Sequence, residues 1–318
     1  MRPGTDPGTD SGLNPGMDTG MRHGTDPGTD GWAALLRRAE TRLAEAGVPS
    51  PRWDAEELAA LVIGSGRGAA LARVAAGAAA GQPDAERFEA LVAERARRVP
   101  LQHLTGCAGF RTIELAVGPG VFVPRPETEL VAEAGILEAR RLVEGGRPAV
   151  VVDLGTGSGA IAAAVAVEVP GAVVHAVEGS APAYAWAQRN LAGRGVTLRL
   201  GDLGEAFPEL DGCVDVVVSN PPYVPTDAVP CEPEVAQHDP FEALYGGPDG
   251  LDVVRAVIAR AATLLRPGGL LVVEHAQTQG RAVPDLLRRA GGWREVLDHP
   301  DLTGRARFST ARKEGQPR

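Results

Sequence analysis

The sequence predicts an α/β protein in which a doubly wound, mostly parallel sheet follows a small N-terminal all-helical domain and a β-hairpin. Apolar side chains recur at helical spacing from residue 31 to about residue 100. Between residues 104 and 125 the pattern shifts towards alternation, and beyond it short apolar runs alternate with helical segments. A chain of 318 residues is long enough for one such α/β domain and a smaller companion.

Residues 1–30 are expected to form a disordered, low-complexity tail, because they repeat the unit Pro-Gly-Thr-Asp. Glycine and proline at this density bury too little apolar surface to offset the entropy of ordering the backbone. All three methionines, Met1, Met17 and Met21, lie in this tail. We therefore hypothesise that translation starts at Met17 or Met21.

The helical domain is expected over residues 31–103. Gly47 and Pro49 end a first helix, and Ser50 precedes a second with N-cap chemistry. The apolar sides of three expected helices, beginning at Trp32, Pro51 and near Asp84, comprise Trp32, Leu35, Leu36, Ala39 and Leu43; Trp53, Leu58 and Leu61; and Phe88, Leu91 and Val92. Taken alone, such a domain is either a packing module or a platform for docking a substrate.

A β-hairpin connector is expected over residues 104–125. Ile113, Leu115 and Val117 alternate with more polar neighbours, and the turn-forming residues 118–120 follow them. Residues 121–123 would form the returning strand. A hairpin at this place would hold the helical domain at a fixed angle to the next domain.

The remaining segment, residues 126–314, has the strand and helix alternation of a doubly wound sheet. The expected strands cover residues 149–153, 172–177, 196–200, 214–219 and 270–274, and the expected helices cover residues 158–169 and 181–193. Such sheets bind ligands at the carboxyl ends of their strands. The loops after Asp153, Val177, Leu200 and Ser219 should therefore line one crevice.

The loop after the first strand is rich in glycine and passes directly into a helix. Its sequence from Asp153 is Asp-Leu-Gly-Thr-Gly-Ser-Gly, and Gly155, Gly157 and Gly159 allow tight turns and a close approach to a ligand. The spacing GxGxG differs from the dinucleotide fingerprint GxGxxG and suits an amino-acid and ribose moiety better than a pyrophosphate. We expect this loop, including Thr156 and Ser158, to bind a cofactor.

Acidic and apolar residues at the next two strand ends extend the expected cofactor site. Glu178 ends the second strand, where its carboxylate can accept hydrogen bonds from both hydroxyls of a ribose. Asp202 and Leu203 follow the third strand, so one can meet an exocyclic amine and the other can form an apolar wall. An exposed, solvated carboxylate is the alternative interpretation of Glu178.

The fourth strand ends in Asn220-Pro-Pro-Tyr223, which we expect to carry the chemistry. Two consecutive prolines make the loop rigid, so the Asn220 side chain and the Pro221 carbonyl can act as aimed acceptors. An NH2 group on a planar system can donate to both and present its nitrogen for methylation. Pro222 completes the rigid corner and Tyr223 can stack on the planar group. The reaction would be methyl transfer from S-adenosylmethionine, to which Asn220 would also lie close.

Bulk properties exclude several classes of function. The net charge of −9 disfavours a broad phosphate-binding surface and hence stable nucleic-acid binding. No run approaches the ~20 apolar residues of a membrane span, and the first residues lack the apolar core of a secretory signal. The three cysteines form no CxxC pair, and His103, His238 and His275 lack metal-ligand spacing, so we expect no metal. We expect a cytoplasmic monomer, with the three histidines as structural hydrogen-bonding residues.

Six segments together resemble the bacterial peptide chain release factor N5-glutamine methyltransferases, the HemK-like protein-glutamine methyltransferases. The segments are Arg98-Val-Pro-Leu-Gln-His-Leu-Thr-Gly106, Val123-Pro-Arg-Pro-Glu-Thr-Glu129, Asp153 to Gly159, Ser219 to Tyr223, His238-Asp-Pro240 with Ala243-Leu244, and Gly246 to Leu251. The second segment is the most particular to this family. The resemblance covers nearly the whole chain after the tail.

The resemblance implies a seven-stranded class I methyltransferase sheet, with S-adenosylmethionine as cofactor and release factors as protein substrates. It implies that residues 155–159 and Glu178 bind the cofactor, that Leu203 borders it, and that residues 220–223 bind the glutamine of a Gly-Gly-Gln motif. The helical domain would then dock the substrate. Two departures are Glu178, where the family usually has aspartate, and Ala306, where it also usually has aspartate.

Two alternative activities use similar residues. A ribosomal-protein glutamine methyltransferase presents the same amide chemistry. A nucleic-acid adenine N6-methyltransferase presents an NH2 group on a planar ring, but it should carry a basic surface or a target-recognition domain. The acidic balance of the chain argues against the second alternative. An inactive binding protein on the same fold is disfavoured because Asn220, Pro221 and Tyr223 are all present.

Overall fold

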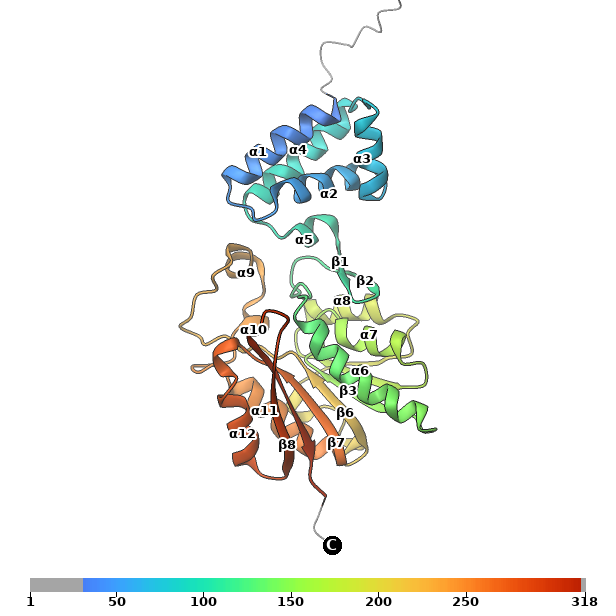
Figure 1. The fold of residues 1–318 in the computed structure, drawn as a ribbon, viewed down its shortest axis with the longest axis vertical. Coiled ribbons are helices and arrows are strands. Elements are labelled where there is room, and N and C mark those ends of the chain that lie inside the picture. Colours follow the sequence, from blue (N-terminus) through green and yellow to red (C-terminus); the bar gives the residue numbers. More distant parts are fainter. Residues whose placement is uncertain (1–30, 316–318) are drawn as a thin grey trace, which may run out of the picture.

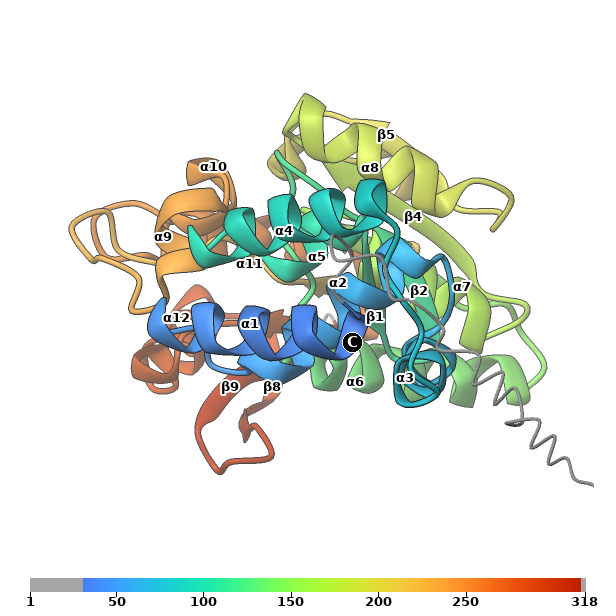
Figure 2. The same ribbon diagram turned by 90° about the horizontal axis from the view of Figure 1, so that it is seen from above.

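The computed structural model describes residues 31–315 of the chain. The expected disordered tail, with Met17 and Met21, lies outside the described residues. The described chain forms an all-helical unit, a short hairpin and an α/β domain, stacked along the long axis of the molecule (Figure 1). Seen from the helical end, α1 and α4 run side by side above the sheet (Figure 2).

The helical unit packs around one apolar core. Its helices are α1 (Trp32–Glu45), α2 (Pro51–Ile63), α3 (Arg67–Ala75), α4 (Gln82–Ala96) and α5 (Leu101–Thr105). Trp32 and Phe88 meet edge to face, with ring centroids 5.5 Å apart, and Leu43 and Leu58 are fully buried beside them. The three helices expected from apolar periodicity correspond to α1, α2 and α4. The apolar residues on the inward face of each helix form this core.

The buried side of α2 differs from the expectation. Trp53 is 49% exposed, and the Arg67 guanidinium lies over its ring at 3.8 Å. Asp54 and Glu56 are buried instead, because each is paired with arginine. Helices α3 and α5 were not expected, since α3 buries only Ala70 and α5 buries no residue fully.

The hairpin connector is present, but its turn is not where alternation placed it. Strand β1 (Cys107–Phe110) pairs antiparallel with β2 (Ile113–Ala116), so the turn lies at Arg111. Residues 118–120 follow the hairpin, and residues 121–123 form no strand. Residues 118–121 do form the expected turn, with the Val121 N–H donating to the Gly118 carbonyl at 3.4 Å, but this turn does not join the hairpin strands. Gly118 instead makes a close contact: a Cβ there would lie 2.6 Å from the ring of Trp186 in α8 (Ala181–Leu191).

The α/β domain contains a seven-stranded sheet in the order β5-β4-β3-β6-β7-β9-β8, in which β9 runs antiparallel to both of its neighbours, β7 and β8. The strands are β3 (Val150–Leu154), β4 (Val173–Glu178), β5 (Thr197–Leu200), β6 (Val214–Ser219), β7 (Leu265–Glu274), β8 (Trp293–Pro300) and β9 (Ala306–Lys313). The expected doubly wound, mostly parallel seven-stranded sheet is confirmed. The last two strands were not located from the sequence. Buried and exposed residues do not alternate regularly along β8, and register shifts interrupt its pairing with β9.

Helices cover both faces of the sheet. One face packs on α6 (Thr128–Glu144), α7 (Ala160–Glu168) and α8 (Ala181–Leu191), and the other on α11 (Asp252–Leu264) and α12 (Ala282–Ala290). The remaining short elements are α9 (Pro233–His238), α10 (Phe241–Leu244), η1 (Leu203–Glu205), η2 (Pro208–Leu210) and η3 (Gln277–Gln279). No single helix within residues 31–315 is long and apolar enough to cross a membrane, and the one pair that qualifies together is bent by 90°.

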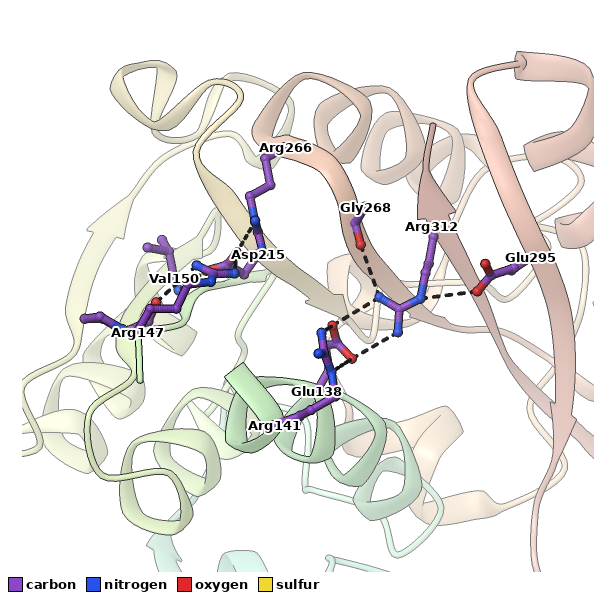
Figure 3. Close-up of polar contacts among 10 residues, drawn as sticks. Glu138, Arg141, Arg147, Val150, Asp215, Arg266, Gly268, Glu295 and Arg312 are labelled. Atoms are coloured by element: carbon purple, nitrogen blue, oxygen red, sulfur yellow. Dashed lines mark hydrogen bonds and ion pairs between the residues drawn. The ribbon is translucent and has the colours of Figure 1, made fainter. Parts of the chain in front are cut away.

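Two buried carboxylates fasten the amino-terminal end of the sheet (Figure 3). Asp215, near the start of β6, accepts hydrogen bonds from Arg147 at 2.6 and 3.0 Å and from the Val150 N–H at 2.9 Å. Glu138 of α6 is held by Arg312 of β9, with N–O distances of 3.0 and 3.1 Å. These pairs tie α6, β3, β6 and β9 together at the end opposite Asn220.

Candidate active site

One cavity of about 1300 Å³ lies at the carboxyl ends of the parallel strands. Loops after β3, β4, β5 and β6 all line it, as strand order predicted. Eleven of the twelve residues named from the sequence line this cavity: Gly155, Thr156, Gly157, Ser158, Glu178, Asp202, Leu203, Asn220, Pro221, Pro222 and Tyr223. The twelfth, Gly159, is buried at the start of α7, where a Cβ would press on Leu191 at 3.1 Å.

A buried carboxylate shapes the glycine loop between β3 and α7. The Asp153 Oδ2 accepts hydrogen bonds from the Thr156 hydroxyl at 2.6 Å and from the Ala162 N–H at 3.1 Å. Burial raises the pKa of Asp153 to about 7, against the lowering effect of Thr156. Gly155 and Gly157 have φ of +74° and +58°, and a Cβ on Gly157 would meet only open space. Since Gly157 lines the cavity, that open space is part of the cavity.

Glu178 at the end of β4 bridges two loops of the cavity. Its Oε2 accepts a hydrogen bond from the Gly157 N–H at 2.7 Å, and its Oε1 accepts one from the Ser180 N–H at 2.8 Å. A carboxylate has about four acceptor positions, so both oxygens retain capacity for hydroxyl donors. The longer glutamate arm therefore reaches the glycine loop while it still lines the cavity.

Asp202 and Leu203 occupy the third strand end in different ways. The Asp202 Oδ1 accepts a hydrogen bond from the Gly204 N–H at 2.7 Å and so caps the short η1 turn. Leu203 lies across the glycine loop, 3.8 Å from where a Cβ on Gly155 would stand. The two residues thus offer a partly engaged carboxylate and an apolar wall to the same cavity.

The Asn-Pro-Pro-Tyr corner is tied directly to the strand that precedes the glycine loop. The Ser219 hydroxyl donates to the Leu154 carbonyl at 2.6 Å, and β3 and β6 are parallel neighbours with Asp153 opposite Val218. Both loops therefore leave the sheet side by side into one cavity. Chemically, the corner offers amide and carbonyl acceptors to the same cavity that the glycine loop lines.

Two residues that the sequence did not single out lie beneath this corner. The Asn220 Nδ2 donates to the Thr128 hydroxyl at 3.1 Å, and the Tyr223 hydroxyl donates to the Glu274 Oε1 at 3.2 Å. Burial raises the pKa of Tyr223 above its usual value and that of Glu274 to about 7. An acidic residue at the end of an apolar strand was the available signal for Glu274. Arg307 of β9 also lines the cavity, and no local pattern indicated it.

Ion pairs secure the segment that borders the cavity mouth. Arg125 lies 3.1 Å from Asp239, and burial raises the pKa of that carboxyl to about 6. Glu234 of α9 binds Arg95 and Arg98 of the helical unit. At this mouth the connector, α9 and the α/β domain all contribute residues to the lining of the cavity.

Two of the three histidines named from the sequence have a hydrogen-bond partner: His275, and His103, which bonds the Val121 backbone. His275 is fully buried, with its ring nitrogens 3.0 Å from the Ala276 carbonyl and the Ser309 hydroxyl. The Nε2 atoms of His103 and His238 are buried without a hydrogen-bond partner in the described part of the chain. Within residues 31–315 no three His, Cys, Asp or Glu side chains gather as metal ligands would.

Family models match two parts of the chain. The model described as "PrmC N-terminal domain" matches residues 34–106, and the model described as "Methyltransferase small domain" matches residues 136–237. The first covers the helical unit up to the hairpin, and the second covers most of the loops that line the cavity.

Curated relatives match over most of the chain. Proteins named "Release factor glutamine methyltransferase" are 54% identical in Streptomyces coelicolor, over 88% of this chain and 97% of the relative, and 47% identical in Mycolicibacterium smegmatis, over 87% and 95%. A third from Deinococcus radiodurans is 44% identical over 88% and 98%. Among solved structures, a T. thermophilus 16S rRNA N2 G1207 methyltransferase, in complex with AdoMet and guanosine, aligns with a TM-score of 0.47 and 26% identity, over 65% of this chain and 50% of that one.

Proposed function

The chain belongs to the release factor glutamine methyltransferase family, and from that membership we propose how its cavity performs the reaction. The protein transfers a methyl group from S-adenosylmethionine to the side-chain amide nitrogen (N5) of a glutamine. Its substrates are peptide chain release factors, and the target is the glutamine of their Gly-Gly-Gln motif. The observation that carries the assignment of the site is that the glycine loop and the Asn-Pro-Pro-Tyr corner share one cavity.

The residues at the first three strand ends fit the cofactor. Gly157 leaves open space on the cavity side, where any larger side chain would intrude. Glu178 can accept hydrogen bonds from the ribose hydroxyls, Leu203 gives the adenine an apolar wall, and Asp202 stands beside it. Thr156 and Ser158 complete the loop around the amino-acid part. S-adenosylmethionine supplies a methyl group on a positively charged sulfur.

The fourth strand end fits the glutamine. We assign the two amide N–H groups of the substrate to the Asn220 Oδ1 and the Pro221 carbonyl, which lie on a loop that prolines make rigid. Tyr223, whose hydroxyl is anchored on Glu274, can pack its ring along the flat carboxamide. An amide nitrogen is a poor nucleophile, so acceptors that polarise the NH2 stabilise the transition state preferentially. Fixed orientation can lower the barrier by roughly 7 to 11 kcal/mol.

The helical unit is proposed to dock the release factor, with the boundaries given above: residues 31–103 for the unit, 104–125 for the connector and 126–314 for the catalytic domain. Glu234 links the unit to the cavity mouth, so a protein bound to both would be oriented over Asn220. We further propose a monomeric, cytoplasmic enzyme, since release factors act on cytoplasmic ribosomes. The net charge of −9 supports a protein substrate over a nucleic acid.

Peptide mass mapping tests this function. Purified release factors are incubated with the protein and S-adenosylmethionine, and the peptide that contains the Gly-Gly-Gln motif is analysed. We expect one added methyl on the glutamine and none when the cofactor is omitted. Methylation of a ribosomal protein, or of adenine in a parallel nucleic-acid assay, with no change in the release factor would favour an alternative.

A further inference from the structure

A carboxylate outside the proposed mechanism lies directly behind the substrate corner. Glu274 ends β7, the parallel neighbour of β6, and is 1% exposed. Its Oε1 accepts the hydrogen bond from the Tyr223 hydroxyl, while its Oε2 is buried with no hydrogen-bond partner among residues 31–315. Burying an ionisable group costs folding free energy unless its oxygens accept hydrogen bonds. A functional role would explain why a glutamate stands at this buried position.

Thr128 connects this carboxylate to Asn220. It is the first residue of α6 and is 4% exposed, and its hydroxyl oxygen accepts the Asn220 Nδ2 hydrogen bond at 3.1 Å. A threonine hydroxyl that accepts one hydrogen bond still has its own proton to donate. In the β6–β7 register Ser219 lies opposite Val273, which places Glu274 level with Asn220. Burial raises the pKa of Glu274, and the Thr128 hydroxyl lowers it by favouring the charged form. A chain of polar side chains therefore leads from Asn220 through Thr128 to Glu274, whose Oε1 also accepts the hydrogen bond from Tyr223.

The Glu274 carboxylate sets the donor-to-acceptor direction of the hydrogen bonds in this series. An ionised carboxylate only accepts hydrogen bonds, so the Thr128 proton turns towards Glu274 and the Thr128 lone pair faces Asn220. The Asn220 amide then places its NH2 on Thr128 and leaves its Oδ1 free for the cavity. If the amide turned over, its NH2 would meet the NH2 of the substrate, donor against donor.

We propose that Glu274, acting through Thr128 and Tyr223, is a positioning residue that holds the Asn220 amide with its oxygen towards the substrate glutamine. This inference rests on the proposed function, because it assumes that an NH2 group is what the oxygen receives. Glu274 itself does not touch the reacting atoms in this scheme.

Glu274→Gln is the first test, because glutamine keeps the shape but can donate as well as accept. The chain can then run in reverse and turn the Asn220 amide over. We expect kcat with a release factor to fall roughly 10- to 100-fold, since small misplacements in an active site have effects of that size. The Kd for S-adenosylmethionine, measured by calorimetry, should stay within about twofold of wild type.

Substitutions at Thr128 separate the hydroxyl from the bulk of the side chain. Thr128→Val removes the relay and should lower kcat as Glu274→Gln does, whereas Thr128→Ser retains the hydroxyl and should keep most of the activity. Because both residues act through one chain, the double variant should lose no more than the poorer single variant. A matched control is Glu138→Gln, a buried glutamate of α6 held by Arg141 and Arg312, which should leave kcat unchanged.

The dependence of kcat on pH distinguishes a positioning role for Glu274 from a purely structural one. The charged or titratable groups that face Glu274 are Arg307 from β9, Glu127 ahead of α6 and Tyr223. A protonated Glu274 can donate a hydrogen bond, so it no longer forces the Thr128 hydroxyl to point its proton towards the carboxylate. The wild-type kcat should therefore fall as pH drops below about 7. The Glu274→Gln profile should lack this limb.

Three results would overturn the inference: wild-type kcat in Glu274→Gln, a Thr128→Ser enzyme as impaired as Thr128→Val, or additive losses in the double variant. The proposed function is read separately in the same assay. If wild-type enzyme leaves the release factor unmethylated, the function fails; if wild type is active and the variants match it, only the role of Glu274 fails.

Discussion

Arg98 of the helical unit forms a two-pronged ion pair with Glu234, which follows it by 136 positions in the chain. The Arg98 Nε lies 2.8 Å from the Glu234 Oε1, and its Nη2 lies 2.5 Å from Oε2. Arg95 also donates to Oε1 at 2.8 Å, and its guanidinium is held in turn by buried Asp54 at 2.7 Å. The unit proposed to dock the substrate is thereby linked to the segment at the cavity mouth.

Glu234→Gln should weaken the use of the protein substrate while leaving cofactor binding intact. Although burial opposes it, hydrogen bonds from Arg98 and Arg95 lower the pKa of Glu234 to about 2, so the pair is charged at neutral pH. Loss of that charge frees α9 from the helical unit, and KM for the release factor should rise by roughly threefold or more. Steady-state kinetics with each substrate varied will measure this. Glu209→Gln, which breaks a half-exposed pair with Arg199, is the control and should change neither KM.

Asn220→Ala should impair turnover far more than cofactor binding. The variant removes one acceptor for the substrate amide, and loss of a comparable polar group in other active sites lowers kcat by about 100- to 1000-fold. Single-turnover methylation and calorimetric titration with S-adenosylmethionine give the two quantities. Equal losses in turnover and cofactor affinity would contradict the assignment of Asn220 to the glutamine.

Gly157→Ala should weaken cofactor binding by roughly tenfold, because its new Cβ would stand in open space that belongs to the cavity. The residue has φ of +58°, so alanine also adds strain of about 1 kcal/mol. Gly146→Ala is a matched control, since it has φ of +87°, an unobstructed Cβ position and no place in the cavity. Both variants should lose similar unfolding free energy, and only Gly157→Ala should raise the Kd for S-adenosylmethionine.

Glu274→Gln should stabilise the protein at alkaline pH even though it lowers activity. Burial raises the pKa of Glu274 to about 7 from its ordinary value of 4.5, so the folded state holds this proton more tightly than the unfolded state. The contribution of Glu274 to stability is therefore fully present below pH 4.5 and is lost as pH rises through 7. The gain from Glu274→Gln should be on the order of 3 kcal/mol larger at pH 8 than at pH 4.5. Denaturant unfolding at the two pH values measures it, and a gain that does not depend on pH would contradict the prediction.

Local patterns in the sequence were sufficient for the parts of the fold that are stabilised locally. The stripe from Trp32 to Leu43 predicted α1, and the apolar run before Ser219 predicted β6, because helices and buried parallel strands impose their own periodicity. Strand order then placed the glycine loop and Asn220 at one crevice. Those predictions depended only on residues close together in the chain.

Contacts between distant segments were decided by the tertiary structure alone. Trp53 is a large apolar residue that would be expected in the core, but it is exposed on α2. Asp54 lies on the buried face of that helix instead, paired with Arg95, which is 41 positions away in the chain. Thr128 and Glu274 are ordinary residues in their own segments and meet Asn220 and Tyr223 only when α6, β6 and β7 pack together. The sequence by itself thus determined the strongly periodic helices and strands and the reacting corner, but not α3, α5, β8 or β9. Packing determined how the Asn220 amide and the Tyr223 hydroxyl are oriented, because their hydrogen-bond partners, Thr128 and Glu274, come from other segments of the chain.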